Sequence, residues 1–367
     1  MAEISYIPAN VIERFVEEVF QAVGVPEEDA RICADVLITS DLRGIESHGI
    51  QRLKAYYDRI KAGVQVTRTQ IEIVKETETT AVIDGHHGMG QVIAYQAMTL
   101  AIHKAKRYGL GGVAVRHGNH FGIAGYYPLM AAKEGLMGFA VTNARPAIAP
   151  TFGTEPMLGT NPIAFAAPSD MPYPFCYDGA TSIAQRGKVE VAARIDKPLA
   201  PGLVVDAEGN PATNAKKVLD DLGKDQAALL PLGGAGEDFG GHKGFGLSTM
   251  VEILSASLGA GMYLKDLLGV APDGSRRPFM IGHFFLAIDI EHFVPMEVSR
   301  HITGEIMRAL QESRKAPGHD KIYVAGEKEY AMEKRRREQG IPINDNLLQE
   351  LRTIRDEQRL SGYEAYL

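Results

Sequence analysis

The sequence contains little cysteine and no long apolar run, and each absence narrows the kind of protein it encodes. Its two cysteines, Cys33 and Cys176, lie far apart in apolar surroundings. This favours buried free thiols in a reducing compartment over a disulfide or a zinc site. The N-terminus carries no basic-then-apolar signal, and no apolar run reaches the roughly 18 residues that span a bilayer. We therefore expect a cytoplasmic protein with no membrane partner.

An excess of positive charge is also missing. The chain has 39 Lys and Arg against 46 Asp and Glu, a net charge of −7, and no basic cluster is interleaved with aromatic residues. Nucleic acid is therefore not an expected partner. With 367 residues, of which 45% are apolar, the chain is long enough to bury a full core divided between two or three lobes.

The fingerprint of Rossmann domains is absent from its usual context. The one Gly-x-Gly-x-x-Ala string, Gly109–Ala114, follows a predicted helix and opens a predicted strand. This reverses the order that dinucleotide binding by a Rossmann domain requires. We therefore expect no standard Rossmann domain.

The sequence does contain a helical start, a mixed middle and a helical end. Residues 8–43 carry apolar side chains at the spacing of two helices, and a third helix is predicted over 53–60. From residue 70, segments rich in β-branched residues alternate with helical ones, which is typical of a mixed α/β domain. We predict a helical domain over 1–70, a mixed-sheet domain over 71–290, and C-terminal helices over 291–367 that pack with the N-terminal part.

The same periodicity predicts the remaining elements. Residues 196–226 read as a surface excursion, and residues 327–366 as solvated helices. The predicted strands are 70–74, 80–84, 112–116, 138–142 and 279–290, and the predicted helices are 91–108, 124–134, 247–258 and 298–315.

A histidine beside a hydroxyl and a glycine, Ser47-His48-Gly49, lies at the predicted break between two helices. A serine can fix the tautomer of a histidine, which is a general acid or base near neutral pH. Arg52 follows one helical turn later and can hold a carboxylate with two hydrogen bonds. The pattern alone is also compatible with a helix cap.

Two further histidines, His117 and His120, lie between a predicted strand and a predicted helix. Loops in this position gather catalytic and ligand-binding groups. The His-x-x-His spacing can bind a metal, but neither a His-Glu-x-x-His pattern nor a compact set of carboxylates accompanies it. A catalytic or cofactor-facing His120, the metal site of a hydrolase and a structural histidine are the alternatives.

Three other segments carry polar groups suited to a ligand. Thr160 and Asn161 precede a proline on a turn and can orient a polar substrate, although turns favour such residues anyway. Asp178 ends an apolar stretch, where a carboxylate can bind a ribose hydroxyl or cap a helix. Lys243 lies among seven glycines ahead of a predicted helix, which describes an anion site for phosphates or a flexible loop. The residues by themselves indicate an α/β enzyme with a phosphate-bearing ligand.

Five motifs, in this order, resemble the type 2 malate/L-lactate dehydrogenase family over about residues 8–345. They are Asp41–Gly49, Asn119–Gly122, Leu158–Pro162, Pro231–Gly234 and Gly241–Gly246. The family also contains sulfolactate, ureidoglycolate and 2,3-diketogulonate reductases and cyclic imine reductases. The resemblance implies an α/β fold without a Rossmann unit: a helical region from both chain ends, and a mixed, largely antiparallel sheet domain that binds NAD or NADP. It also implies a homodimer whose active sites receive residues from both subunits.

The resemblance further implies roles for single residues. Ser47 and His48 form a relay that exchanges a proton with the substrate oxygen, although some members assign this exchange to the histidine matching His120. Glu190 matches an acidic relay partner of some members. Cofactor contacts are implied for His120, Phe121, Gly122, Asp178, Gly179, Ala180, Lys243, Pro317 and Gly318, with Gly179 standing where the family commonly has Met.

The implied reaction is hydride transfer between nicotinamide C4 and C2 of a 2-oxo acid whose carboxylate is held by Arg52 and Thr160. Malate and oxaloacetate are the preferred pair, because Asn119–Tyr127 and the loop at 143–146 look most like malate-active members. Arg145 would meet the second carboxylate. Lactate, sulfolactate, ureidoglycolate or a cyclic imine acid are alternatives within the family. Outside it, the alternatives are a metal-dependent hydrolase and a non-catalytic nucleotide-binding protein.

Overall fold

The middle of the chain forms a seven-stranded mixed sheet in the computed structural model, which describes residues 4–271 and 273–367. Only β3 and β4 pair in parallel, and the other neighbours are antiparallel. The strands, in spatial order, are β2 (Glu72–Glu76), β3 (Thr80–Asp84), β4 (Leu110–Gly118), β10 (Ile281–Asp289), β5 (Leu136–Thr142), β6 (Ile163–Ala167) and β7 (Phe175–Gly179). The prediction of a mixed, largely antiparallel sheet without a Rossmann unit is confirmed.

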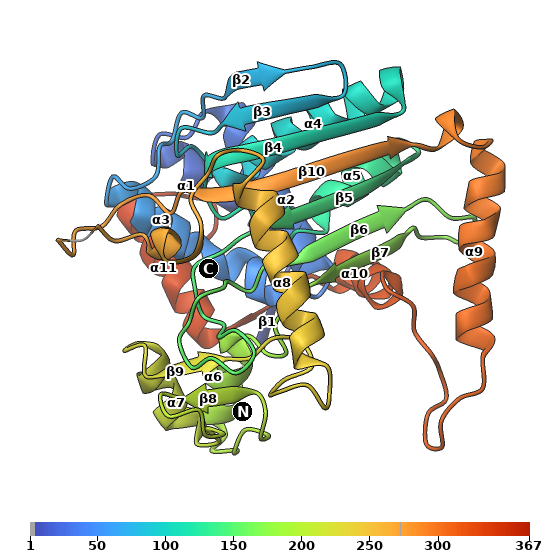
Figure 1. Ribbon diagram of the computed structural model, residues 1–367. Helices are drawn as coiled ribbons and strands as arrows, with labels where there is room; N and C mark the ends of the chain where they lie inside the picture. The colour runs from blue at the N-terminus through green and yellow to red at the C-terminus, as the bar shows by residue number, and fades with distance from the viewer. Residues whose placement is uncertain (1–3, 272) are drawn as a thin grey trace.

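Helices cover the two faces of this sheet unequally (Figure 1). On one face lie α4 (Gly90–Tyr108) and α5 (Tyr126–Lys133), while α8 (Gly241–Ala256) crosses the other. The helix α4 lies very close to β4, because a Cβ atom on Gly111 would be 1.9 Å from the carbonyl oxygen of Ala101. Small residues on both elements therefore allow the close approach that closes the core.

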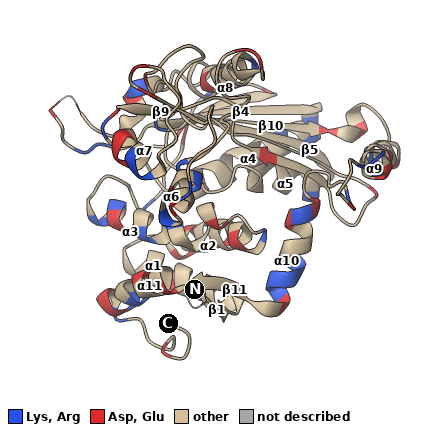
Figure 2. Cartoon of the chain, turned by 90° about the horizontal axis from the view of Figure 1, so that it is seen from below, with Lys and Arg blue, Asp and Glu red and all other residues tan. Residues whose placement is uncertain are grey.

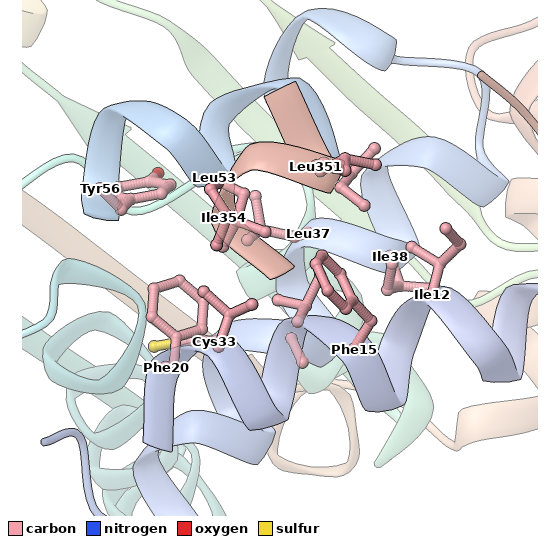
Figure 3. Packing of buried hydrophobic residues seen from close by; sticks show 14 of the residues in the cluster. Ile12, Phe15, Phe20, Cys33, Leu37, Ile38, Leu53, Tyr56, Leu351 and Ile354 are labelled. Atoms are coloured by element: carbon pink, nitrogen blue, oxygen red, sulfur yellow. The ribbon is translucent and has the colours of Figure 1, made fainter. Parts of the chain in front are cut away.

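A second core joins the two ends of the chain (Figure 3). Phe15 and Phe20 of one N-terminal helix pack with Leu351 and Ile354 near the C-terminus, and β1 (Ile4–Ile7) pairs antiparallel with β11 (Ile341–Asn344). The helices of this layer are α1 (Ala9–Ala22), α2 (Glu27–Leu42), α3 (Leu53–Lys61), α10 (Glu327–Gln339) and α11 (Asp345–Gln358). The expectation that residues 327–366 form solvated helices is wrong for α11, since its apolar stripe is buried.

The segment predicted as a surface excursion folds into a small packed unit. Its own core contains Val189, Val204, Val218 and Leu229. Its elements are α6 (Arg186–Arg194), β8 (Val204–Asp206), α7 (Ala215–Leu222) and β9 (Ala227–Leu229). The turn-rich composition of 196–226 concealed apolar residues that meet only when the two short strands pair.

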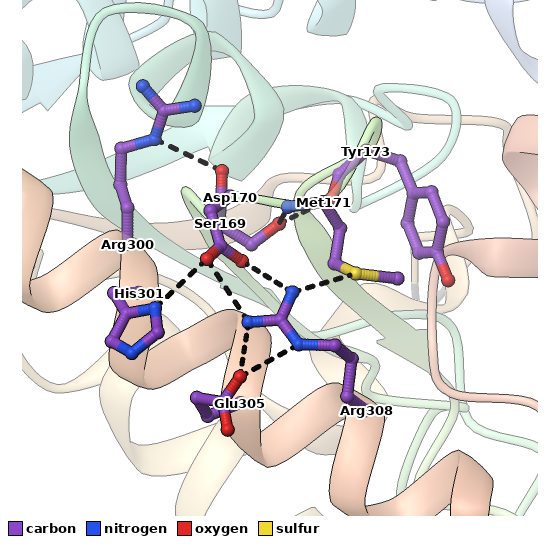
Figure 4. A network of polar contacts seen from close by, with 8 residues as sticks. All are labelled: Ser169, Asp170, Met171, Tyr173, Arg300, His301, Glu305 and Arg308. Atoms are coloured by element: carbon purple, nitrogen blue, oxygen red, sulfur yellow. Dashed lines mark hydrogen bonds and ion pairs between the residues drawn. The ribbon is translucent and has the colours of Figure 1, made fainter.

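A long helix, α9 (Met296–Glu312), lies beside the β7 edge of the sheet (Figure 1). Asp170 holds it by accepting hydrogen bonds from Arg308 Nη1 at 2.9 Å and from His301 Nδ1 at 3.2 Å (Figure 4). Met307 packs with Tyr173 in a small apolar cluster below this network. The exposed apolar residues of α9 recur every fourth position, at Val298, Ile302, Ile306 and Leu310.

Charge is distributed over the outer helices and is sparse on the sheet (Figure 2). Lys and Arg alternate with Asp and Glu on α7 and α10. Strands β5 and β6 carry no charged residue, whereas the edge strand β2 carries Glu72, Lys75 and Glu76. Both cysteines, Cys33 and Cys176, are buried and free, as predicted. Within residues 4–271 and 273–367, no helix is both long and apolar enough to cross a membrane.

Candidate active site

The turn that carries His48 connects α2 to α3 through two short 3₁₀ helices, η1 (Glu46–His48) and η2 (Ile50–Arg52). Beneath it, Asp41 accepts a hydrogen bond from the backbone N–H of Ile50 at 2.7 Å. The predicted break between two helices is confirmed, and buried groups fix its shape.

Arg336 of α10 holds the same turn from the other side. Its guanidinium donates to the backbone carbonyl of Asp41 and to the carboxylate of Glu46. The turn that carries His48 is thus held between the end of α2 and α10, a helix almost 300 residues later in the chain. Such support is what keeps a reacting side chain in one orientation.

His48 lies beside both of its predicted neighbours. Its Nδ1 atom is 2.8 Å from Ser47 Oγ, and the Nε atom of Arg52 donates to the Ser47 carbonyl at 2.6 Å. Burial, with the positive charge of Arg52, lowers the pKa of His48 to about 4. The imidazole is therefore neutral at physiological pH and free to accept or pass on a proton.

The loop after β4 brings His120 against His48. The two rings stack with centroids 5.4 Å apart and planes 22° from parallel. Tyr56 of α3 places its hydroxyl 2.5 Å from His120 Nδ1. Burial, followed by the neighbouring His48, moves the pKa of His120 well below the usual range. Sequence reasoning missed Tyr56, since an aromatic residue at helical spacing predicts only core packing.

These side chains open on a cavity of about 930 Å³, within the range of roughly 300–1,000 Å³ common for ligand sites. Ten of the predicted site residues line it. They are Ser47, His48, Arg52, His120, Gly122, Thr160, Asp178, Gly179, Ala180 and Glu190. Arg186, Lys188 and Glu329, which the sequence did not single out, line it too.

Thr160 is held at the cavity wall by a buried polar network behind it. Asn161 has a positive φ of 39° and donates to Glu252 Oε2 at 2.8 Å. Glu252 also accepts from Asn143 Nδ2 at 3.2 Å, and burial raises the pKa of its carboxyl. Asn161 therefore fixes the turn, whereas Thr160 is the member of the pair that lines the cavity.

Asp178, at the end of β7, also lines the cavity. Its Oδ2 atom accepts from the backbone N–H of Gly125 at 2.7 Å, and burial raises the pKa of its carboxyl to about 6. At Gly179, an added Cβ would lie 2.5 Å from the hydroxyl of the exposed Tyr177, and nothing else in the structure explains the glycine at this position. Glu190 of α6 pairs with Arg186 Nε at 3.2 Å.

Several predicted residues lie elsewhere. Arg145 is exposed on its loop, and Pro317 and Gly318 are exposed between α9 and α10. Phe121 is buried below the cavity, 4.6 Å edge-on from the His283 ring. None of these four lines the cavity described above.

Lys243 also lies outside this cavity, in the first turn of α8 and beside a separate hollow of about 380 Å³. The helix α8 begins at Gly241, six residues before its predicted start. Added Cβ atoms on Gly241 and Gly244 would lie 2.1 Å from the Gly234 carbonyl and 2.0 Å from the Leu232 carbonyl. These two glycines therefore have a packing role, because the helix lies directly on the loop before it.

His117 does not share a site with His120. Its Nδ1 atom is hydrogen-bonded to Asp84 Oδ2 at 2.9 Å. His117 does not line the cavity that His120 lines. In the part of the chain that the structure describes, no group of three or more His, Cys, Asp or Glu side chains is placed to hold a metal. The hydrolase alternative therefore has no ligand set among these residues.

The donor set of the cavity fits a nicotinamide cofactor. Asp178 offers a carboxylate for a hydroxyl, Thr160 a side-chain hydroxyl, and Arg186 and Lys188 positive charges for phosphates. Gly122 approaches the cavity with a positive φ of 82°, and an added Cβ there would lie 2.5 Å from Val36 Cγ1. Glycine at this position therefore allows the loop to pack directly on the buried Val36 of α2.

The family model for malate/L-lactate dehydrogenase matches residues 7–352. The chain belongs to this family. Malate dehydrogenase of Pyrococcus horikoshii is 46% identical over 348 residues, which cover 95% of this chain and 94% of that protein. L-sulfolactate dehydrogenase of Methanocaldococcus jannaschii is 40% identical over 345 residues, covering 94% and 95%. The predicted family is confirmed.

Solved structures agree with the family assignment. Malate dehydrogenase from Entamoeba histolytica superposes with a TM-score of 0.94 at 42% identity, covering 98% of this chain and 99% of that one. This dehydrogenase is therefore an oxidoreductase of hydroxy and oxo acids, with the family's fold over nearly its whole length. His48, Arg52 and His120 meet at one cavity of that fold.

Proposed function

We propose that this dehydrogenase interconverts a 2-hydroxy acid and a 2-oxo acid with NAD or NADP, and that malate and oxaloacetate are its preferred pair. The observation that carries the proposal is the meeting of His48, Arg52, His120 and Thr160 at one cavity wall. When bound, the nicotinamide supplies or accepts the hydride at C4. The names of relatives, malate dehydrogenase in Pyrococcus horikoshii among them, support the choice of substrate.

The residues of the chain divide the remaining work. The Arg52 guanidinium holds the C1 carboxylate with two parallel hydrogen bonds, helped by the Thr160 hydroxyl, which orients C2 for hydride transfer. His48 accepts the hydroxyl proton during oxidation and returns it during reduction, with Ser47 Oγ at 2.8 Å as the next group of the relay. The lowered pKa of His48 keeps the imidazole ready as a base.

Malate differs from lactate by a second carboxylate, which needs its own positive partner. Arg145, predicted for this role, does not line the cavity of its own chain. Arg186 and Lys188 at the start of α6 do line it and are better placed to meet the second carboxylate or the cofactor phosphates. Glu190, proposed as an acidic partner of the relay, lines the cavity one turn along α6 and also pairs with Arg186.

We also propose a cytoplasmic homodimer. Lys243, Pro317 and Gly318, predicted to contact the cofactor, lie away from the cavity of their own chain, so a second copy would have to bring them to it. Exposed apolar residues on α8 and α9 give such a copy a surface to cover. These residues are Leu247, Met250, Ile253, Val298, Ile302, Ile306 and Leu310. In the first copy, Gly122, Asp178, Gly179 and Ala180 would receive the cofactor, and the buried Phe121 would support the loop that carries Gly122.

A panel of substrates and cofactors tests the reaction. NADH and NADPH oxidation would be followed at 340 nm with oxaloacetate, pyruvate, sulfopyruvate and a cyclic imine carboxylic acid. We expect the highest kcat/KM for oxaloacetate, with pyruvate clearly slower because it lacks the second carboxylate. A higher kcat/KM for sulfopyruvate would make sulfolactate, and not malate, the proposed substrate. The absence of turnover with every pair of oxo acid and cofactor would overturn the proposed reaction.

A further inference from the structure

Tyr56 places a buried hydroxyl against His120 Nδ1 from a separate element. It lies on α3, is 4% exposed, and its ring sits 6.3 Å from Phe20 and 5.9 Å from His120. Neighbouring Leu53 and Tyr57 are buried in the core formed by the two chain ends. The position of the Tyr56 hydroxyl is therefore set by the helical layer and not by the loop that carries His120.

The direction of the hydrogen bond follows from counting protons. Burial raises the pKa of Tyr56, so the phenol is neutral and keeps its single proton. Among residues 4–271 and 273–367, His120 Nδ1, at 2.5 Å, is the acceptor that this hydroxyl meets. The backbone N–H of Gly122 points at the same nitrogen from 3.4 Å. Both contacts are satisfied together when Nδ1 presents its lone pair.

A neutral imidazole carries one proton, so the proton of His120 lies on Nε2. His48 is placed differently, since its Nδ1 faces Ser47 Oγ. A serine hydroxyl both donates and accepts, and it allows either tautomer of His48. One histidine of the stacked pair is locked, and the other is free to change.

We propose that Tyr56 is a positioning residue that locks His120 as an Nε2–H donor, so that His120 polarises the substrate oxygen and His48 alone exchanges the proton. The inference rests on the proposed function. During reduction, C2 of the oxo acid gains the hydride, and the carbonyl π electrons move onto oxygen. That oxygen takes the Nε2 proton of His48 while Nδ1 of His48 takes the hydroxyl proton of Ser47, 2.8 Å away, and water in the cavity reprotonates Ser47. His120 keeps its own proton and stabilises the charge developing on oxygen.

The first test removes only the hydroxyl, with Tyr56→Phe, and uses Tyr57→Phe as its matched control. Tyr57 is the adjacent buried tyrosine, and its hydroxyl donates to Glu357 Oε2 at 2.7 Å, away from the cavity. For Tyr56→Phe we expect a fall in kcat of about 10- to 100-fold, less than the roughly 100- to 1,000-fold that loss of a direct oxyanion donor costs, because part of the His120 population keeps its Nε2 proton. KM should stay within about twofold. Tyr57→Phe should keep the wild-type kcat.

A nuclear magnetic resonance experiment reads the tautomer without turnover. In protein labelled with ¹⁵N-histidine, the His120 signals, assigned by their loss in His120→Gln, should show a proton on Nε2 in the wild type and in Tyr57→Phe. In Tyr56→Phe the proton should divide between the two nitrogens. A proton on Nδ1 in the wild type would overturn the inference.

The third test distinguishes a hydrogen-bond donor from a proton carrier. A glutamine side chain can place an N–H close to the position of Nε2 but cannot exchange a proton. We therefore expect kcat of His120→Gln to be at least about tenfold higher than kcat of His120→Ala. At the other histidine, kcat of His48→Gln should be no higher than kcat of His48→Ala. Equal loss in His120→Gln and His120→Ala, with NADH binding retained, would assign the proton exchange to His120.

These outcomes separate the inference from the proposed function. If the wild type turns over none of the oxo acids, the proposed function fails, and the tautomer measurement still decides the hydrogen bond. If the wild type is active and Tyr56→Phe matches Tyr57→Phe in kcat and in tautomer, only the positioning role of Tyr56 fails.

Discussion

The Oδ2 atom of Asp41 accepts a hydrogen bond from the backbone N–H of Ile50 at 2.7 Å, and this contact ties the end of α2 to the turn that carries His48. The carboxyl is 1% exposed. Burial raises its pKa from 3.8 to about 7, more than the Ile50 hydrogen bond lowers it. The carboxyl that supports the active-site turn thus makes the free energy of unfolding depend on pH.

Replacing Asp41 with Asn should remove a pH dependence of stability. The folded pKa of about 7 lies above the unfolded value near 3.8, so the folded state binds more protons between these values, and wild-type stability falls as pH rises through that window. The free energy of unfolding of Asp41→Asn, relative to wild type, should therefore increase from pH 4 to pH 7, by up to about 4 kcal/mol at about 1.4 kcal/mol per pKa unit. Urea unfolding at several pH values measures this difference in the free energy of unfolding.

The exposed Asp320→Asn serves as control. A difference between Asp41→Asn and wild type that stays constant from pH 4 to pH 7 would contradict the expectation.

Replacing Gly49 with Ala should damage both stability and activity. The added Cβ would lie 2.0 Å from Asp41 Oδ1, a group locked in place by Ile50. Overpacking of this kind costs about 1–3 kcal/mol, and the displaced turn should lower kcat by moving His48. Gly187→Ala is the control for stability, because nothing lies within 4 Å of its added Cβ. Equal midpoints of urea unfolding for the two variants would show that the turn adapts freely.

The pH profile of malate oxidation should report the lowered pKa of His48. Oxidation needs the neutral imidazole, so kcat/KM falls when His48 is protonated, and the acid limb should lie near pH 4 and not near the ordinary 6.5. A folded pKa below the unfolded value also means that stability falls as pH drops from 6.5 toward 4. Each assay therefore needs a circular dichroism spectrum at the same pH. An acid limb at pH 6–7 in folded protein would assign the base to another group.

Local patterns in the sequence predicted the elements well and their spatial neighbours poorly. The helices α1 to α4 and strand β10 fall within a few residues of their predicted bounds, because each has a clear hydrophobic period. The insertion of β10 between β4 and β5 depends on pairings between residues more than 100 positions apart, such as Phe284 with Val141. No local period contains that information.

The site shows the same division. Motifs located His48, Arg52 and His120, since a histidine next to glycine at a helix break is a local signal. Tyr56 carries no local signal of this kind, because a tyrosine that only packs in the core and a tyrosine that hydrogen-bonds to a histidine occupy the same helical position. Arg186 was missed for a similar reason, since no motif marks the short helix α6, which packs on the core around Val189.

A charge on the apolar face of α8 should separate the proposed dimer. Leu247, Met250 and Ile253 recur every third residue and are 38%, 40% and 55% exposed. An aspartate at such a position would be desolvated without a partner in any interface that covers the face. We therefore expect wild type to sediment as a dimer and Ile253→Asp as a monomer in analytical ultracentrifugation. Ile195→Asp, 65% exposed at the end of α6, should remain dimeric. Because Lys243 would reach the cofactor only from the second copy, the Ile253→Asp monomer should also bind NADH at least about tenfold more weakly, as for one lost charged contact. A monomeric wild type with full activity would contradict both the dimer and the shared site.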